Sequence, residues 1–94
     1  MIPITEIELK IKQKVKASYL QVIDLRGGDH IQVVVVSPDF ENKSLVEQHK
    51  IIYDILQDEM KSNAIHALAL KTYSPAQWEK IRGSFKGGVD HAIW

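Results

Sequence analysis

With 94 residues, and with twelve basic side chains balanced by twelve acidic ones, the chain is expected to form one small domain that lacks the strongly basic surface of a general nucleic-acid binder. No cysteine is present, which excludes disulfides and limits any metal site built from this chain alone to His, Asp and Glu. No run approaches the roughly 18 apolar residues of a membrane span, and the first residues lack the apolar core of a signal peptide, so we expect a cytoplasmic protein.

The first segment, residues 4–16, fits two patterns. One helical face would carry Ile4, Ile7, Ile11 and Val15. Thr5 and Glu8 would form a capping box, and Glu6 and Lys10 a favourable pair four residues apart. Charged and apolar residues also alternate here, as they do in a strand. The capping residues favour the helix.

A β-hairpin follows. Residues 19–25 are expected to form its first strand, and Gly27 and Gly28 can supply the positive φ angles of a tight turn. Residues 30–37 contain four consecutive valines and give the strongest strand signal in the chain. Pro38 should end this strand, because proline cannot continue the hydrogen-bond ladder.

A long helix is expected after a loop at residues 39–43. Ser44 and Glu47 have the spacing of a capping box at its start. We expect its apolar stripe to comprise Leu45, His49, Ile52, Tyr53, Leu56 and Met60. The helix should end near Asn63, since asparagine tolerates the left-handed conformation at a helix exit.

Residues 65–72 read as a strand that is apolar except for His66 near its start. Ser74 and Gln77 then have the spacing of a second capping box, which opens a helix over residues 75–82. We expect Trp78, which lies in this helix, to anchor it to the sheet. The sequence alone leaves two roles open for His66, as a hydrogen-bonded structural residue or as a metal ligand.

The order of these elements is α-β-β-α-β-α. It predicts a single-domain α+β sandwich, in which helices pack on a three-stranded mixed sheet and the third strand runs parallel to one of the others. We expect residues 1–82 to form this domain. Three glycines in residues 83–94 predict a flexible C-terminal tail.

Three blocks carry a family resemblance: HIQVVVVSPDF at 30–40, FENKSLVEQHKIIYDIL at 40–56, and IHALALKTYSPAQW at 65–78. In this order and spacing they resemble BolA-like proteins, over about residues 5–82. The resemblance implies an αββαβ fold related to the type II KH topology. It also implies that the first segment is a helix.

The resemblance further implies a non-enzymatic partner of monothiol glutaredoxins of the Cys-Gly-Phe-Ser type, with which such proteins hold a bridging [2Fe-2S] cluster. The histidine of the Ile-His-Ala-Leu block, here His66, would be one iron ligand. A hairpin residue would be another, and His30 is the first candidate, with Asp29 as the alternative. The glutaredoxin cysteine and a glutathione thiolate would complete the ligand set. The isolated chain is expected to carry no cofactor, and to be a monomer or a weak homodimer.

The resemblance also allows a nucleic-acid-binding transcriptional regulator, with a surface that would include Lys43, Lys50 and Lys71. Neutral net charge disfavours it, because long-range attraction to phosphates is absent. Gln48 also disfavours it, since the family usually has an arginine there. Asn42 replaces a usual glycine but tolerates the same left-handed turn.

The remaining histidines are expected to bind nothing. His49 lies on the predicted apolar stripe and is interpreted as a structural residue, and His91 in the tail as solvated. No nucleophile with a paired base, no paired carboxylates and no phosphate-binding glycine loop are present. A third hypothesis is a plain interaction domain that needs no metal.

Overall fold

A computed structural model describes residues 3–81. Its elements are α1 (Ile4–Lys14), β1 (Tyr19–Arg26), β2 (His30–Val36), the 3₁₀ turn η1 (Pro38–Phe40), α2 (Leu45–Ile55), α3 (Gln57–Lys61), β3 (Ala67–Tyr73) and α4 (Pro75–Ile81). The predicted order of helices and strands is confirmed. The predicted tail at residues 83–94, including His91, lies outside the described residues.

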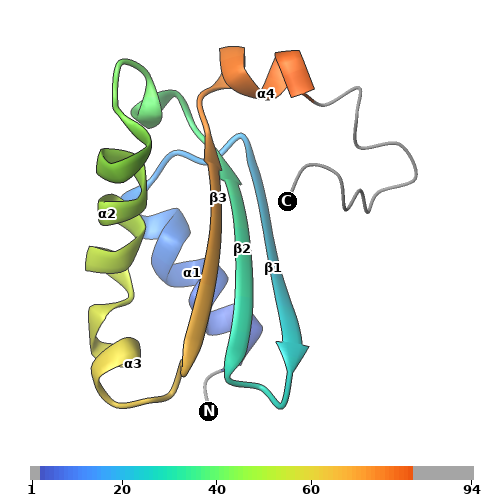
Figure 1. Ribbon diagram of the computed structural model, residues 1–94, viewed down its shortest axis with the longest axis vertical. Helices are drawn as coiled ribbons and strands as arrows, with labels where there is room; N and C mark the ends of the chain where they lie inside the picture. The colour runs from blue at the N-terminus through green and yellow to red at the C-terminus, as the bar shows by residue number, and fades with distance from the viewer. Residues whose placement is uncertain (1–2, 82–94) are drawn as a thin grey trace.

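The three strands form one mixed sheet in the order β1-β2-β3. β1 and β2 are antiparallel, and β3 runs parallel to β2, with His30 opposite Ala67 at one end and Val36 opposite Tyr73 at the other. Helices α1 and α2 lie on one side of the sheet, and α4 lies at the end far from the β1–β2 turn (Figure 1). The start of β3 and the β1–β2 turn therefore share one end of the molecule. Among residues 3–81, no helix has the length and apolarity needed to cross a bilayer.

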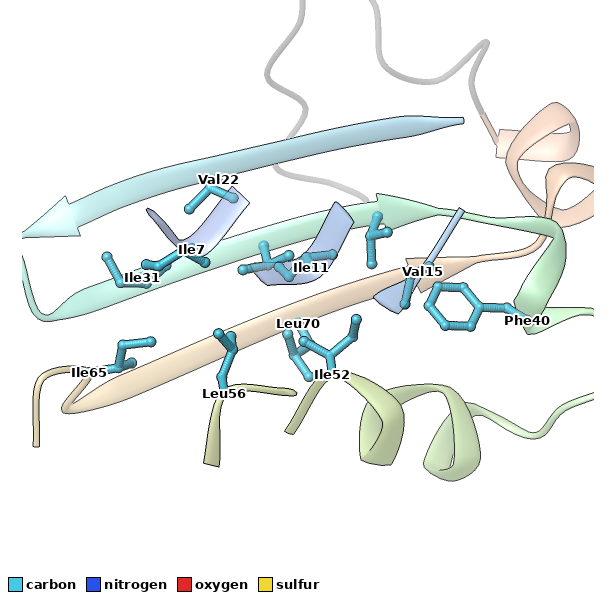
Figure 2. Packing of buried hydrophobic residues seen from close by; sticks show 12 residues of the cluster. Ile7, Ile11, Val15, Val22, Ile31, Phe40, Ile52, Leu56, Ile65 and Leu70 are labelled. Carbon is cyan, nitrogen blue, oxygen red and sulfur yellow. The ribbon is translucent and has the colours of Figure 1, made fainter. Parts of the chain in front are cut away.

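The core fills the space between the two helices and the sheet (Figure 2). Its buried side chains come from every main layer: Ile7, Ile11, Val15, Val22, Ile31, Val33, Val35, Phe40, Ile52, Leu56, Ile65 and Leu70. Alternate residues of β2 point into this core, as the pleat of a strand requires. The opposite face of β2 is covered too, since Val34 and Val36 are also buried.

Helix α1 begins differently from the prediction. Pro3 is its N-cap and makes no side-chain cap hydrogen bond, so Thr5 lies inside the helix and the predicted capping box is wrong. Lys10 forms its salt bridge with Glu59 of α3, at 2.6 Å, rather than with Glu6. The predicted apolar face is nevertheless confirmed, because that face is what packs on the sheet.

The predicted long helix is two helices, since the backbone leaves the α-helical conformation at Leu56, where φ is −103° and ψ is 15°. Its predicted stripe is wrong in part: Leu45 is 61% exposed and Tyr53 is 42% exposed. The buried residues of α2 are Gln48 and Ile52, and Leu56 continues the same four-residue spacing. Gln48 thus occupies a buried position of α2, and a search for apolar residues could not identify that position because glutamine is polar.

Two predicted turns and one contact are confirmed. Asn42 and Asn63 adopt φ angles of 63° and 64°, in the left-handed region. Trp78 of α4 stacks on Tyr19 of β1, with ring centroids 5.1 Å apart, and meets Tyr73 of β3 at 5.5 Å. These rings fasten α4 to the sheet.

The capping box of α2 is formed as predicted, and it supports a stability prediction. The Ser44 hydroxyl accepts a hydrogen bond from the Glu47 amide at 3.2 Å, and the Glu47 carboxylate accepts one from the Ser44 amide at 2.7 Å. We expect Ser44→Ala to lower the free energy of unfolding by about 1 kcal/mol, as measured by urea denaturation. Ser44→Asp, which can still cap, should stay near the wild type. Equal stability of all three proteins would contradict this account.

Candidate functional site

The β1–β2 turn sets the position of His30. Gly27 and Gly28 have φ angles of 70° and 82°, as predicted, and the Gly28 amide donates a hydrogen bond to the Asp24 carboxylate at 3.0 Å. The strand register shifts between Asp24 and Arg26, so β1 is irregular just before the turn. After the turn, His30 is the first residue of β2, at the rim of the sheet.

Parallel pairing brings His66 to the same rim. Because His30 is opposite Ala67, the preceding His66 arrives beside the hairpin turn. The backbone carbonyl of Asp29 accepts hydrogen bonds from the amides of His66, at 2.7 Å, and of Ala67, at 3.1 Å. The centroids of the two imidazole rings lie 5.5 Å apart, and the ring planes are inclined by 52°. The structure therefore places the two histidines singled out from the sequence side by side.

The Asp29 carboxylate contacts the nearer ring. Its Oδ1 lies 2.7 Å from Nδ1 of His30, and this hydrogen bond lowers the pKa of Asp29 below its ordinary value. Both side chains are partly exposed, and His66 is exposed. The two rings are thus open to another molecule at the surface.

The number of available ligands limits what this site can bind. Within residues 3–81, no group of three or more His, Cys, Asp or Glu side chains gathers closely enough to hold a metal ion. The pair of imidazoles can supply two nitrogen ligands. A metal bound here would therefore need its remaining ligands from a second molecule.

The lysines proposed for nucleic acid lie away from this pair. Lys43 and Lys50 are exposed at the start and on the outer side of α2, and Lys71 is half-buried on β3. Lys50 lines a shallow groove with Val46, His49 and Tyr53. Lys71 is close enough to His49 to influence its charge. The acidic Glu47 lies between Lys43 and Lys50 in the sequence, so the surface has mixed charge.

The pKa of His49 provides a test of the contact between His49 and Lys71. Burial, and then the charge of Lys71, lower the pKa of His49 from its ordinary 6.5. The unfolded chain therefore binds this proton more readily, so the contribution of His49 to stability is present above about pH 6.5 and is lost as pH falls through the folded-state pKa. We expect Lys71→Gln to raise the pKa of His49, but not fully to 6.5, in an NMR titration. Lys50→Gln is the control, and an unchanged pKa in Lys71→Gln would contradict the predicted contact.

The sequence interpretation of Gln48 as the loss of a positive surface charge is wrong, because Gln48 is not on the surface. Its side chain is only 1% exposed. It donates to the backbone carbonyls of Phe40 and Lys43, at 3.3 and 3.1 Å, and accepts from the Thr72 hydroxyl at 2.8 Å. This residue joins α2 to β3 and to the loop before α2, and it does not bear on surface charge.

Comparison with known proteins identifies the family of this chain. A model of the family described as BolA-like protein matches residues 5–77. Protein BOLA2 of Arabidopsis thaliana is 39% identical over 82 residues, which covers 84% of this chain and 86% of that protein. The DNA-binding transcriptional regulator BolA of Haemophilus influenzae is 35% identical over 81 residues, covering 78% of each chain.

A solved structure shows the same fold. The BolA domain of SufE1 from Arabidopsis thaliana superposes with a TM-score of 0.72 at 36% identity, covering 78% of this chain and 92% of that domain. The α+β architecture with a three-stranded mixed sheet is common to both. On the family match, the relatives and the fold together, the chain belongs to the BolA-like protein family.

Proposed function

We propose that this protein is a non-enzymatic iron–sulfur adaptor, which pairs with a monothiol glutaredoxin and co-ligates a bridging [2Fe-2S] cluster through His66 and His30. The observation that carries the proposal is the proximity of the two imidazoles, 5.5 Å between centroids, at an accessible rim of the sheet. The complex of the two proteins would serve either cluster trafficking or the regulation of iron and redox responses.

The ring separation suits two nitrogen ligands on one metal. With metal–nitrogen bonds of about 2 Å and a tetrahedral angle, two imidazole centres lie about 5 Å apart. The rings need only a small adjustment from the observed 5.5 Å to reach that geometry. When bound, a cluster with imidazoles on one iron supplies one-electron chemistry at a higher potential than an all-thiolate cluster.

The need for a partner follows from the residues of this chain. It has no cysteine, so it cannot hold a four-thiolate cluster. The pair at the rim offers two ligands, and the glutaredoxin cysteine with a glutathione thiolate would supply the rest. Exposure of His66 is consistent with ligation at an interface rather than inside this domain.

Reconstitution tests the proposal. The protein is mixed with a monothiol glutaredoxin, glutathione, iron and sulfide, and the visible circular dichroism spectrum is recorded. We expect a spectrum distinct from that of the glutaredoxin homodimer, and we expect His66→Ala to abolish it. His49→Ala, which replaces a histidine of α2 near Lys71, should leave the spectrum unchanged. A wild-type spectrum and cluster lifetime in His66→Ala would refute the ligand assignment.

A second candidate is a nucleic-acid-binding regulator. Two observations favour it. The Haemophilus influenzae relative is named a DNA-binding transcriptional regulator. Two lysines also lie near His49, since Lys71 is close to it and Lys50 lines the same groove. Phosphate contacts would make affinity fall steeply with salt, by about one log unit per log unit of salt for each contact. We expect Lys50→Ala to reduce that slope if this surface binds DNA. Absence of binding at low salt would eliminate the candidate.

A further inference from the structure

We infer that Asp29 is the positioning residue of this site: its carboxylate fixes the tautomer of His30, and its backbone carbonyl fixes the start of β3 beside it. The inference rests on the proposed function and adds to it a residue that is not itself a ligand. Two separate sets of contacts carry it, one from the side chain and one from the main chain.

The side-chain contact determines which nitrogen of His30 is free. An ionised carboxylate can only accept hydrogen bonds, so Nδ1 of His30, 2.7 Å from Oδ1 of Asp29, must carry the proton. In the neutral ring this leaves Nε2 with an unshared electron pair. Nε2 is then the nitrogen that can bind a metal, as in other carboxylate–histidine–metal arrangements.

The main-chain contacts determine where His66 lies. The Asp29 carbonyl oxygen accepts from two successive amides, those of His66 and Ala67, at 2.7 and 3.1 Å. These bonds join the hairpin turn to the residue at which β3 starts. One residue of the turn thus holds the backbone of His66 and the ring of His30, and it sets the 5.5 Å separation of the rings.

The same geometry makes Asp29 a poor candidate for a direct ligand. Its carboxylate would have to leave Nδ1 of His30 to reach a metal, and the ring would then lose the partner that orients it. In addition, the described residues contain no group of three potential ligands at this place. The sequence had left Asp29 as an alternative to His30, and the contacts favour a division of roles between the two.

The tautomer can be measured in the isolated chain, without any cluster. Long-range ¹H–¹⁵N correlations of the histidine rings are recorded above about pH 8, where ordinary imidazoles are neutral. We expect His30 to be protonated at Nδ1 in the wild type and to shift toward protonation at Nε2 in Asp29→Ala. Asp29→Asn, whose amide oxygen can still accept, should retain the wild-type tautomer. The His66 ring should not respond, because its link to Asp29 is through the backbone.

Asp24→Ala is the matched control. It removes the β1 carboxylate that accepts from the Gly28 amide of the turn, whereas the carboxylate bonded to the His30 ring is that of Asp29. A tautomer change in Asp24→Ala equal to that in Asp29→Ala would mean that turn flexibility is responsible, and would overturn the inference. Amide spectra of each variant confirm that the domain is folded, and the partial exposure of Asp29 predicts that it will be.

The closing experiment measures how fast a chelator removes iron from the reconstituted complex with glutaredoxin and glutathione. We expect removal to be about 10- to 100-fold faster from Asp29→Ala than from wild type, with Asp29→Asn between them. An unchanged His30 tautomer, or an unchanged rate of iron loss, in Asp29→Ala would overturn the inference. Failure of the wild-type protein to form the complex is a different result, and it would count against the proposed function.

Discussion

Gln48→Leu is expected to lower the free energy of unfolding by about 3 kcal/mol, although leucine has a similar size and belongs in a hydrophobic core. The substitution would leave the Thr72 hydroxyl without its acceptor and the Lys43 carbonyl without the Gln48 donor, whereas the Phe40 carbonyl would keep its hydrogen bond from the Lys43 amide. Each polar group that is buried without a partner costs about 1–3 kcal/mol. Denaturant titration followed by circular dichroism measures the loss.

A double-mutant cycle separates the polar contact from general packing. Thr72→Val removes the other side of the hydrogen bond, and we expect the Gln48–Thr72 pair to show a coupling energy of about 1 kcal/mol. Gln57→Leu, at an exposed position of α3, should change stability by less than about 0.5 kcal/mol. If Gln48→Leu were as stable as the wild type, Gln48 would not be buried in this network.

Ile52→Ala is expected to cost about 3 kcal/mol, whereas Tyr53→Ala at the next position should cost less than about 1 kcal/mol. Ile52 is fully buried among α1, the sheet and Leu56, so its truncation leaves a cavity in the core. Tyr53 is 42% exposed and lines the outer groove of α2. The sequence pattern placed both residues on one apolar stripe.

The comparison of these neighbours tests which face of α2 is buried. Both variants remove a large side chain from the same helix and place alanine there, so helix propensity changes little between them. Thermal unfolding of the two proteins under identical conditions gives the difference directly. Similar losses from both substitutions would contradict the orientation of α2.

The fold was largely predictable, because its signals are local. The valines of β2, the glycine turn and the capping boxes at Ser44 and Ser74 depend on residues close in sequence, and the structure contains each of them. The start of α1 and the buried face of α2 were not, because tertiary contacts determine them. Gln48 is the main example: its polarity suggests the surface, and only the surrounding carbonyls and Thr72 explain its burial.

The sequence named the two histidines of the candidate site but could not show how they are arranged. His66 and His30 came from the resemblance, and a strand pattern by itself cannot say that they meet. Their proximity depends on the parallel register that sets His30 opposite Ala67. Asp29 was noticed as a possible ligand, yet its hydrogen bonds to the His30 ring and to the His66 amide depend on the conformation of the turn.

Counting the histidine nitrogens on the iron tests the central claim most directly. The chain is labelled with ¹⁵N-histidine and reconstituted with unlabelled glutaredoxin and glutathione, and the reduced complex is studied by pulsed electron paramagnetic resonance. We predict two strong ¹⁵N couplings, of which His30→Ala and His66→Ala each remove one. A wild-type complex that shows only one coupling, left unchanged by His30→Ala, would contradict the pairing of the two histidines. No ¹⁵N coupling at all would contradict ligation by this protein.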